Sequence, residues 1–211
     1  MWNHGGAKED QRRLKAVLQS AEKVAGLHLT LTAPRGQFFP HRLLNLMSGT
    51  VAVGEVEGLR RQVGVPEAEP HLQKFLEHRL IEVVATRGEK GYRRTSSGQE
   101  AVNAVHELEE RVGADRASQI FQCCLDKNSI QLFLKVYGSR QAPEGDNIIY
   151  TALEIGRIAA FLSRTMAGVS SIEKLDATGL VSYREDGNAC MNLREATAFY
   201  HYLTRLYGIR P

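Results

Sequence analysis

The sequence has little of what marks secreted, metal-binding or membrane-spanning proteins. It contains three cysteines, of which Cys123 and Cys124 are adjacent and Cys190 stands alone. That spacing fits neither a disulfide framework nor a set of zinc ligands, so we expect free or structural thiols. No apolar run approaches the roughly 20 residues of a membrane-spanning helix, and the N-terminus lacks the apolar centre of a signal peptide. We therefore expect a cytoplasmic protein with no membrane partner and no metal or other cofactor.

Catalytic motifs are equally scarce. The four glycines between residues 36 and 58 lack the lysine and the spacing of a phosphate-binding loop. His71 and His78 lie seven residues apart, without cysteines or carboxylates at metal-ligand spacing, so packing or solvated roles are expected. No acid, base and nucleophile occur together in a recognisable setting. An enzyme is therefore the least expected class.

The composition itself is that of an ordinary soluble protein. The 211 residues suffice for one large domain or two small ones. Hydrophobic residues make up 43% of the chain and charged residues 24%, which are usual fractions. The net charge of +3 and the isoelectric point of about 8.8 permit a nucleic-acid partner without requiring one.

The stretch Leu72–Leu108 is the most informative part of the chain. Apolar residues recur there at helical spacing, and the β-branched run Ile81–Val84 follows them. Two glycines in Arg87–Gly91 allow a reversal, and Tyr92–Thr95 forms a return strand. Thr95 or Ser96 then caps a closing helix over 97–112, with Gln99 placed to complete a capping box. The apolar residues of the first helix are Leu72, Phe75, Leu76 and Leu80.

This order of helix, hairpin and closing helix, with the motif Thr95-Ser96-Ser97-Gly98, resembles the winged helix-turn-helix family. The pattern is common in bacterial transcription regulators, and it identifies an architecture better than a function. The resemblance implies three upstream elements and a helix at the recognition position. These are a helix over His41–Ser48, a strand over Thr50–Val53, a helix over Gly54–Gly64 and the recognition-position helix over Glu67–Arg79.

The charges of this first module are unevenly placed. Glu67 and Glu69 stand at the leading end of the recognition-position helix, where DNA would present phosphates. The basic residues lie in the hairpin instead, where the tip of a wing contacts phosphate or the minor groove. We therefore expect phosphate contacts from Arg87, Lys90, Arg93 and Arg94.

Upstream of this module, Ala7–Ala25 predicts a helix that ends at Gly26, and the alternation in Leu27–Thr32 favours a strand. The helix is either a dimer arm or packed on its own domain. Downstream, a helical region over Arg116–Tyr137 breaks at Asp126–Ser129, and Gly138–Asp146 is a loop.

A second copy of the module follows. Three apolar anchors recur 100 positions later, pairing Phe75 with Leu175, Leu80 with Leu180 and Ile81 with Val181. The copy comprises helices over Ser129–Gly138, Tyr150–Leu162 and Thr165–Thr178, strands over Leu180–Arg184 and Ala189–Leu193, and a closing helix over Arg194–Tyr207. Its recognition position is chemically better suited to DNA, since an arginine, hydroxyls and a lysine cluster there. The residues expected to face the groove are Arg164, Thr165, Ser170, Ser171 and Lys174.

We therefore expect a mainly α protein with small β-hairpins, an α+β fold built from tandem winged helix-turn-helix domains. Residues 1–37 form the N-terminal helix and linker, 38–113 the first domain and 114–211 the second. The expected function is a transcription regulator that binds double-stranded DNA sequence-specifically, with a homodimer as one arrangement and no identified small-molecule effector. Two alternatives stay open: a plasmid or phage replication initiator binding origin repeats, and a protein-interaction module like those of kleisin-associated chromosome-segregation factors.

Overall fold

The computed structural model describes residues 4–32, 39–64, 67–86, 88–123, 127–139, 145–151, 153–154, 157, 173, 175–185 and 188–209. The fold is mainly helical, with two small antiparallel sheets. The elements are α1 (His4–Gln19), α2 (Ala21–Thr32), α3 (Pro40–Leu46), β1 (Thr50–Ala52), α4 (Val53–Val63), α5 (Glu69–Glu77), β2 (Ile81–Thr86), β3 (Glu89–Arg94), α6 (Ser96–Val112), α7 (Ala114–Cys123), α8 (Lys127–Gly138), β4 (Asn147–Tyr150), β5 (Val181–Tyr183), β6 (Ala189–Asn192) and α11 (Leu193–Gly208). No described helix is long and apolar enough to cross a membrane.

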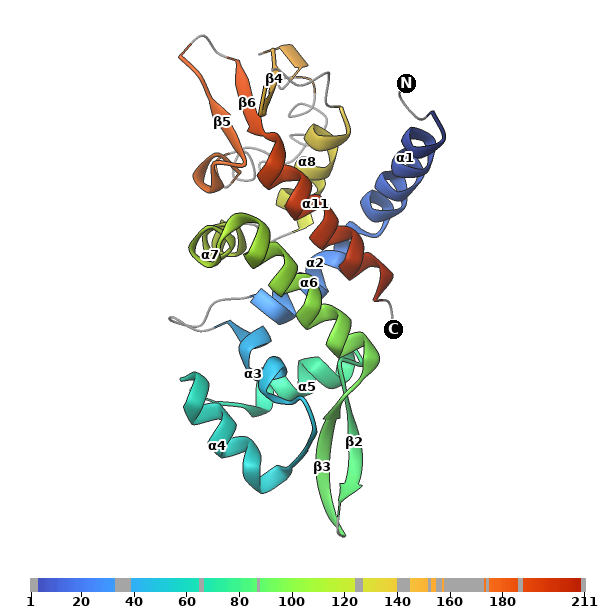
Figure 1. Ribbon diagram of the computed structural model, residues 1–211, viewed down its shortest axis with the longest axis vertical. Coiled ribbons are helices and arrows are strands. Elements are labelled where there is room, and N and C mark those ends of the chain that lie inside the picture. The colour runs from blue at the N-terminus through green and yellow to red at the C-terminus, as the bar shows by residue number, and fades with distance from the viewer. Residues whose placement is uncertain are drawn as a thin grey trace.

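The two sheets lie at opposite ends of an elongated molecule, and α2, α6 and α11 lie between them (Figure 1). Their strand orders are β1-β3-β2 and β4-β6-β5, so in each sheet the last strand of the hairpin is central. In each case a helix precedes the first strand and a long helix directly follows the last. The described parts of the two halves therefore share one sheet topology, with a helix before its first strand and a long helix after its last.

The expected anchors occupy corresponding buried positions in the two halves. Phe75, Leu80 and Ile81 are buried, and so are their partners 100 positions later, Leu175, Leu180 and Val181.

The helices that follow the two first strands also begin alike. The carboxylate of Glu55 accepts from the Ala52 amide at 2.9 Å, and that of Glu154 accepts from the Thr151 amide at 2.8 Å. In each case a glutamate three residues further along the chain accepts from an amide at the start of a helix, where amides lack partners within the helix. This shared detail is not visible in the spacing of apolar residues.

The junction between the first hairpin and α6 is as the sequence predicts. Hairpin pairing sets Val83 opposite Tyr92, and Gly88 takes a φ of 85° in the turn. Thr95 is the N-cap of α6, since its hydroxyl accepts from the Gly98 amide at 3.1 Å. The alternative capping box from Ser96 does not form, because the Gln99 side chain bonds Asn103 and Arg94 instead.

Two sequence expectations are wrong. The stretch 27–32 is not a strand but the second half of α2, and Gly26 lies within that helix. The helix predicted over Ala7–Ala25 is instead divided at Ser20, between α1 and α2. Burial favours the helix over the strand, because Val24, His28 and Leu31 then lie together on the inward face of α2. The hydroxyls of Thr30 and Thr32 donate to carbonyls one turn earlier, which accommodates both residues in the helix.

The second error concerns the start of the second half. Residues 147–150 form β4, paired with β6, whereas the sequence analysis began a helix at Tyr150. Ile148 and Tyr150 are buried and face the core, and the Tyr150 hydroxyl donates to the Val136 carbonyl at 2.7 Å. The β-branched pair Ile148-Ile149 was the available signal for this strand.

α2 runs through the centre of the molecule and contacts α3, α5, α8 and α11. Its His28 is fully buried, and Nδ1 lies 2.9 Å from the Tyr202 hydroxyl on α11. The ring of Phe121 on α7 lies within aromatic contact of both. Buried side chains form one continuous cluster through this centre. α2 is therefore packed within its own chain.

A buried histidine in this cluster predicts acid sensitivity. The His41 ring stacks on Phe39, and its Nε2 lies 3.7 Å from Oε1 of Glu109. Burial lowers the pKa of His41 to about 4, so the ring is neutral in the folded state. The unfolded chain takes up the proton near pH 6.5. The stability that this neutral ring contributes is therefore complete above that pH and is lost as pH falls through about 4.

We expect the free energy of unfolding to fall by about 2 kcal/mol between pH 7 and pH 4.5 through His41 alone. Burial also raises the pKa of Glu109, which acts in the opposite sense, so the comparison needs a matched variant. Urea unfolding of the wild type and of His41→Gln at both pH values isolates the histidine. Equal losses in the two proteins would contradict the prediction.

Candidate nucleic-acid interface

The hairpin β2–β3 projects from one end of the molecule and carries the basic residues expected to hold phosphate (Figure 1). Lys90 is exposed on β3. Within the described part of the chain, no hydrogen bond or ion pair occupies its ammonium group. Arg93 lies on the other face of the hairpin, where its Nη2 is 2.7 Å from Oε1 of Glu82. Lys90 is thus the more available of the two cations.

Arg94 points back toward the body of the protein. Its Nη1 donates to the carbonyls of Leu44 and Asn45 at 3.3 and 3.2 Å, and its Nη2 donates to Oε1 of Gln99 at 2.5 Å. Partial burial lowers the pKa of this guanidinium, which remains far above neutral pH. These bonds tie the base of the hairpin to α3 and α6, so Arg94 serves first to position the hairpin.

α5, at the recognition position, offers no concentrated positive charge. Its outward face carries Gln73, Lys74 and Glu77, and the Gln73 amide donates to the Glu77 carboxylate at 3.2 Å. Glu69 lies in the first turn, where the helix dipole favours a carboxylate and a phosphate would compete with it. The outward face of α5 therefore carries one lysine, Lys74, beside one carboxylate, Glu77.

A groove of about 390 Å³ separates α4 from the start of α5 and ends at the hairpin. Its apolar floor includes Val53, Val56, Leu72 and Tyr92. Its rim is mainly acidic, with Glu57, Glu67 and Glu69 against Arg60. The hydrogen bond from Arg60 lowers the pKa of the exposed Glu57 to about 2, so that carboxylate is ionised at neutral pH. This groove is a poor place for a phosphate.

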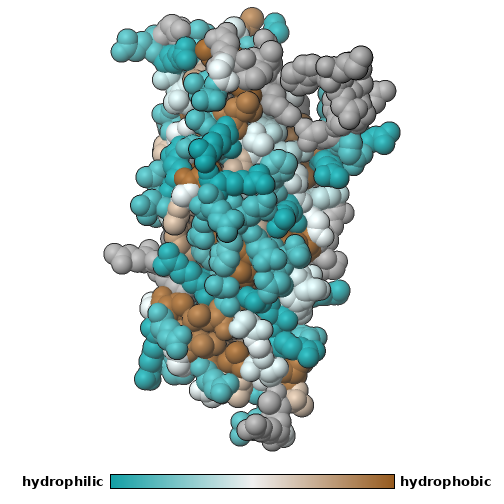
Figure 2. Space-filling model, in the orientation of Figure 1, coloured by the Kyte–Doolittle hydropathy of each residue, from teal (hydrophilic) through white to brown (hydrophobic). Residues whose placement is uncertain are grey.

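Exposed apolar side chains recur at related positions in the two halves. Val53 and Leu153, near the starts of the helices after β1 and β4, are 50% and 64% exposed. Val83 on β2 and Tyr183 on β5 are 54% and 42% exposed. Figure 2 shows an apolar patch over α3 and the start of α4. Each half therefore presents apolar surface beside its first helix and on its hairpin.

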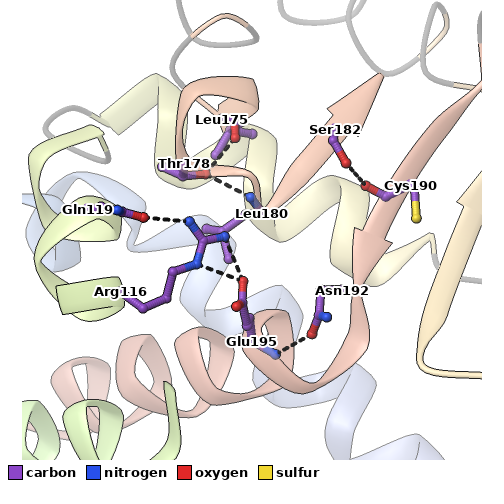
Figure 3. A network of polar contacts seen from close by, with 9 residues as sticks. All are labelled: Arg116, Gln119, Leu175, Thr178, Leu180, Ser182, Cys190, Asn192 and Glu195. Carbon is purple, nitrogen blue, oxygen red and sulfur yellow. Dashed lines mark hydrogen bonds and ion pairs between the residues drawn. The ribbon is translucent and has the colours of Figure 1, made fainter. Parts of the chain in front are cut away.

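The helical turn at 175–178, which leads into β5, is held by a polar network that the sequence analysis did not anticipate (Figure 3). Arg116 on α7 donates to the Glu195 carboxylate on α11 at 2.7 and 3.0 Å and to Gln119 at 2.9 Å. The Thr178 hydroxyl donates to the Leu175 carbonyl and accepts from the Leu180 amide.

Gly179 joins this network because it turns the chain at a φ of 64°, with the Arg116 guanidinium beside it. The network thereby fixes the path of the polypeptide as it enters β5. Its sequence signal was the cap of α11, where Asn192 accepts from the Glu195 amide and so fixes the position of that glutamate.

The remaining candidate contacts lie outside the described residues, so their placement stays a prediction. They are Arg87, Arg164, Thr165, Ser170, Ser171 and Lys174. In the described part of the chain no group of three histidine, cysteine or acidic side chains could hold a metal ion. No family model matches the sequence, and no curated protein or solved structure shows significant similarity to it.

Proposed function

We propose that the chain is a tandem winged helix-turn-helix protein that binds double-stranded DNA and regulates transcription. The observation that carries the proposal is the shared topology of the sheets β1-β3-β2 and β4-β6-β5, each with a helix before it and a long helix after it. In a winged helix the hairpin reaches toward the sugar-phosphate backbone, and the hairpin β2–β3 projects from the body with Lys90 exposed.

The two modules have unequal roles in this proposal. The first contributes phosphate contacts from Lys90 and Arg87, because α5 is too acidic at its start to enter a groove. The second contributes base contacts from Arg164, Thr165, Ser170, Ser171 and Lys174, which combine hydroxyls with cations. Binding to repeated origin sites, as in a replication initiator, would use the same surfaces.

Fluorescence anisotropy with random and self-promoter duplexes at two salt concentrations tests the proposal. We expect Lys90→Ala to weaken binding about threefold to tenfold on both duplexes and to reduce the salt slope by about one, since a single phosphate contact is lost. Lys15→Ala is the matched control, because Lys15 is exposed and α1 lies in the half of the molecule away from the hairpin. Equal effects from the two variants would overturn the role of the hairpin.

A protein-interaction module is the second candidate, and the acidic, apolar groove favours it. Val53, Leu153, Val83 and Tyr183 offer apolar contacts on both modules, and Glu67 and Glu69 would repel phosphate. Under this reading the anisotropy titration gives only weak binding, with the same affinity for both duplexes and no response to Lys90→Ala.

A further inference from the structure

A cavity of about 400 Å³ lies where α2 meets the ends of α5 and α11. Its wall is mostly apolar and comes from α2 and the end of the chain, through Val24, Leu27, Leu206, Tyr207 and Ile209. The size is within the range of small-molecule sites, and such sites combine apolar walls with a few polar groups. An occupant would contact the closing helix of the second half and the recognition-position helix of the first.

The polar groups around this cavity favour positive charge. The carboxylates of Glu22 and Glu77 lie in the lining, against the single ammonium of Lys23 among the described lining residues. Glu77 accepts a hydrogen bond from the neutral Gln73 amide at 3.2 Å, whereas Glu22 is 3.0 Å from the Lys127 ammonium. Burial lowers the pKa of His78, which keeps that ring neutral at pH 7.

Helix dipoles add to this preference. α5 ends at Glu77 and α11 ends at Gly208, so two helix carboxyl ends lie next to lining residues of the cavity. A helix end with unpaired carbonyls carries partial negative charge and favours cations. At α5 the amides of His78, Arg79 and Leu80 already donate to the last carbonyls, so the contribution of that end is small. Apolar walls, a carboxylate that pairs with no cation among the described residues, and the end of α11 therefore act in the same direction.

We propose that this cavity binds an apolar aromatic cation with a single positive charge. The apolar wall takes the aromatic surface, and Glu77 lies at the charged end. The proposal does not depend on DNA binding, because it rests on the lining of a cavity away from the β2–β3 hairpin.

Two ions of the same shape and opposite charge test it. In calorimetric titrations of the full-length protein, we expect tetraphenylphosphonium to bind at least tenfold more tightly than tetraphenylborate. Glu77→Gln should weaken the cation about fivefold, and Lys23→Gln should tighten it by a similar factor, as expected for one charge near a protein surface. Glu89→Gln on the hairpin is the control for an exposed carboxylate elsewhere.

The affinities for the two ions and the responses of the variants distinguish support for the site from its rejection. A loss of cation binding in Glu77→Gln, with an unchanged melting temperature and an unchanged Glu89→Gln control, supports the site. Equal affinity for the two ions overturns the charge preference. Absence of binding by either ion, or the same response to Glu77→Gln and Glu89→Gln, overturns the site itself.

Discussion

Gly98→Ala is expected to lower the free energy of unfolding by about 4 kcal/mol, which is large for the addition of one methyl group. A Cβ at this position would lie 2.1 Å from the Leu80 carbonyl oxygen and 2.8 Å from Cγ of Arg94. The same carbonyl accepts from the amide and the hydroxyl of Thr95. The contact is with backbone at the junction of α5, β2 and α6, so relief requires these elements to move apart.

Gly58→Ala is the matched control for this change. Gly58 is exposed in α4, and a Cβ there meets nothing within 4 Å. We expect it to stabilise the protein by roughly 0.5–1 kcal/mol, because alanine favours the helix interior over glycine. Urea unfolding of both variants measures the two effects. A Gly98→Ala protein as stable as the wild type would show that α6 does not approach Leu80 so closely.

Phe121→Ala is expected to cost about 4 kcal/mol, the usual range for a fully buried phenylalanine. The ring contacts His28 on α2, Phe39 and His41 before and within α3, and Tyr202 on α11. It thus packs against residues from both halves of the chain. Its removal should destabilise the two sheets together.

Hydrogen exchange of backbone amides in β3 and β6 measures this coupling. Both strands should lose protection by a similar free energy in Phe121→Ala, while Val83→Ala, at a half-exposed position, should change either strand by less than about 0.5 kcal/mol. Loss of protection in one strand alone would mean that the halves unfold separately. The cluster around Phe121 would then be a contact between two independent cores.

Local signals in the sequence were sufficient for the hairpins and closing helices. Apolar spacing, paired glycines and a capping threonine all act within a few residues, and the structure confirms the elements they predict near Ile81, Thr95 and Val181. The three anchors that recur 100 positions later are buried in both halves, as expected for corresponding positions. The hairpins and closing helices themselves depend on short-range preferences that a single sequence records.

The errors came from interactions between distant residues. The stretch 27–32 alternates like a strand, yet it is helical because its inward face is buried by α8 and α11. Arg94 looked like a free cation, yet carbonyls some 50 residues earlier accept its hydrogen bonds. Neither partner is indicated by local spacing. It was therefore harder to predict which charged side chains are available to a ligand than to predict where the helices lie.

The contact between His28 and Tyr202 joins residues 174 positions apart. During synthesis α2 emerges long before α11, so the partner of His28 is absent until residue 202 has been made. Chains with such distant pairings fold slowly and expose apolar surface meanwhile. Ribosome-bound lengths that lack α11 would therefore leave uncovered the side of α2 that packs on that helix.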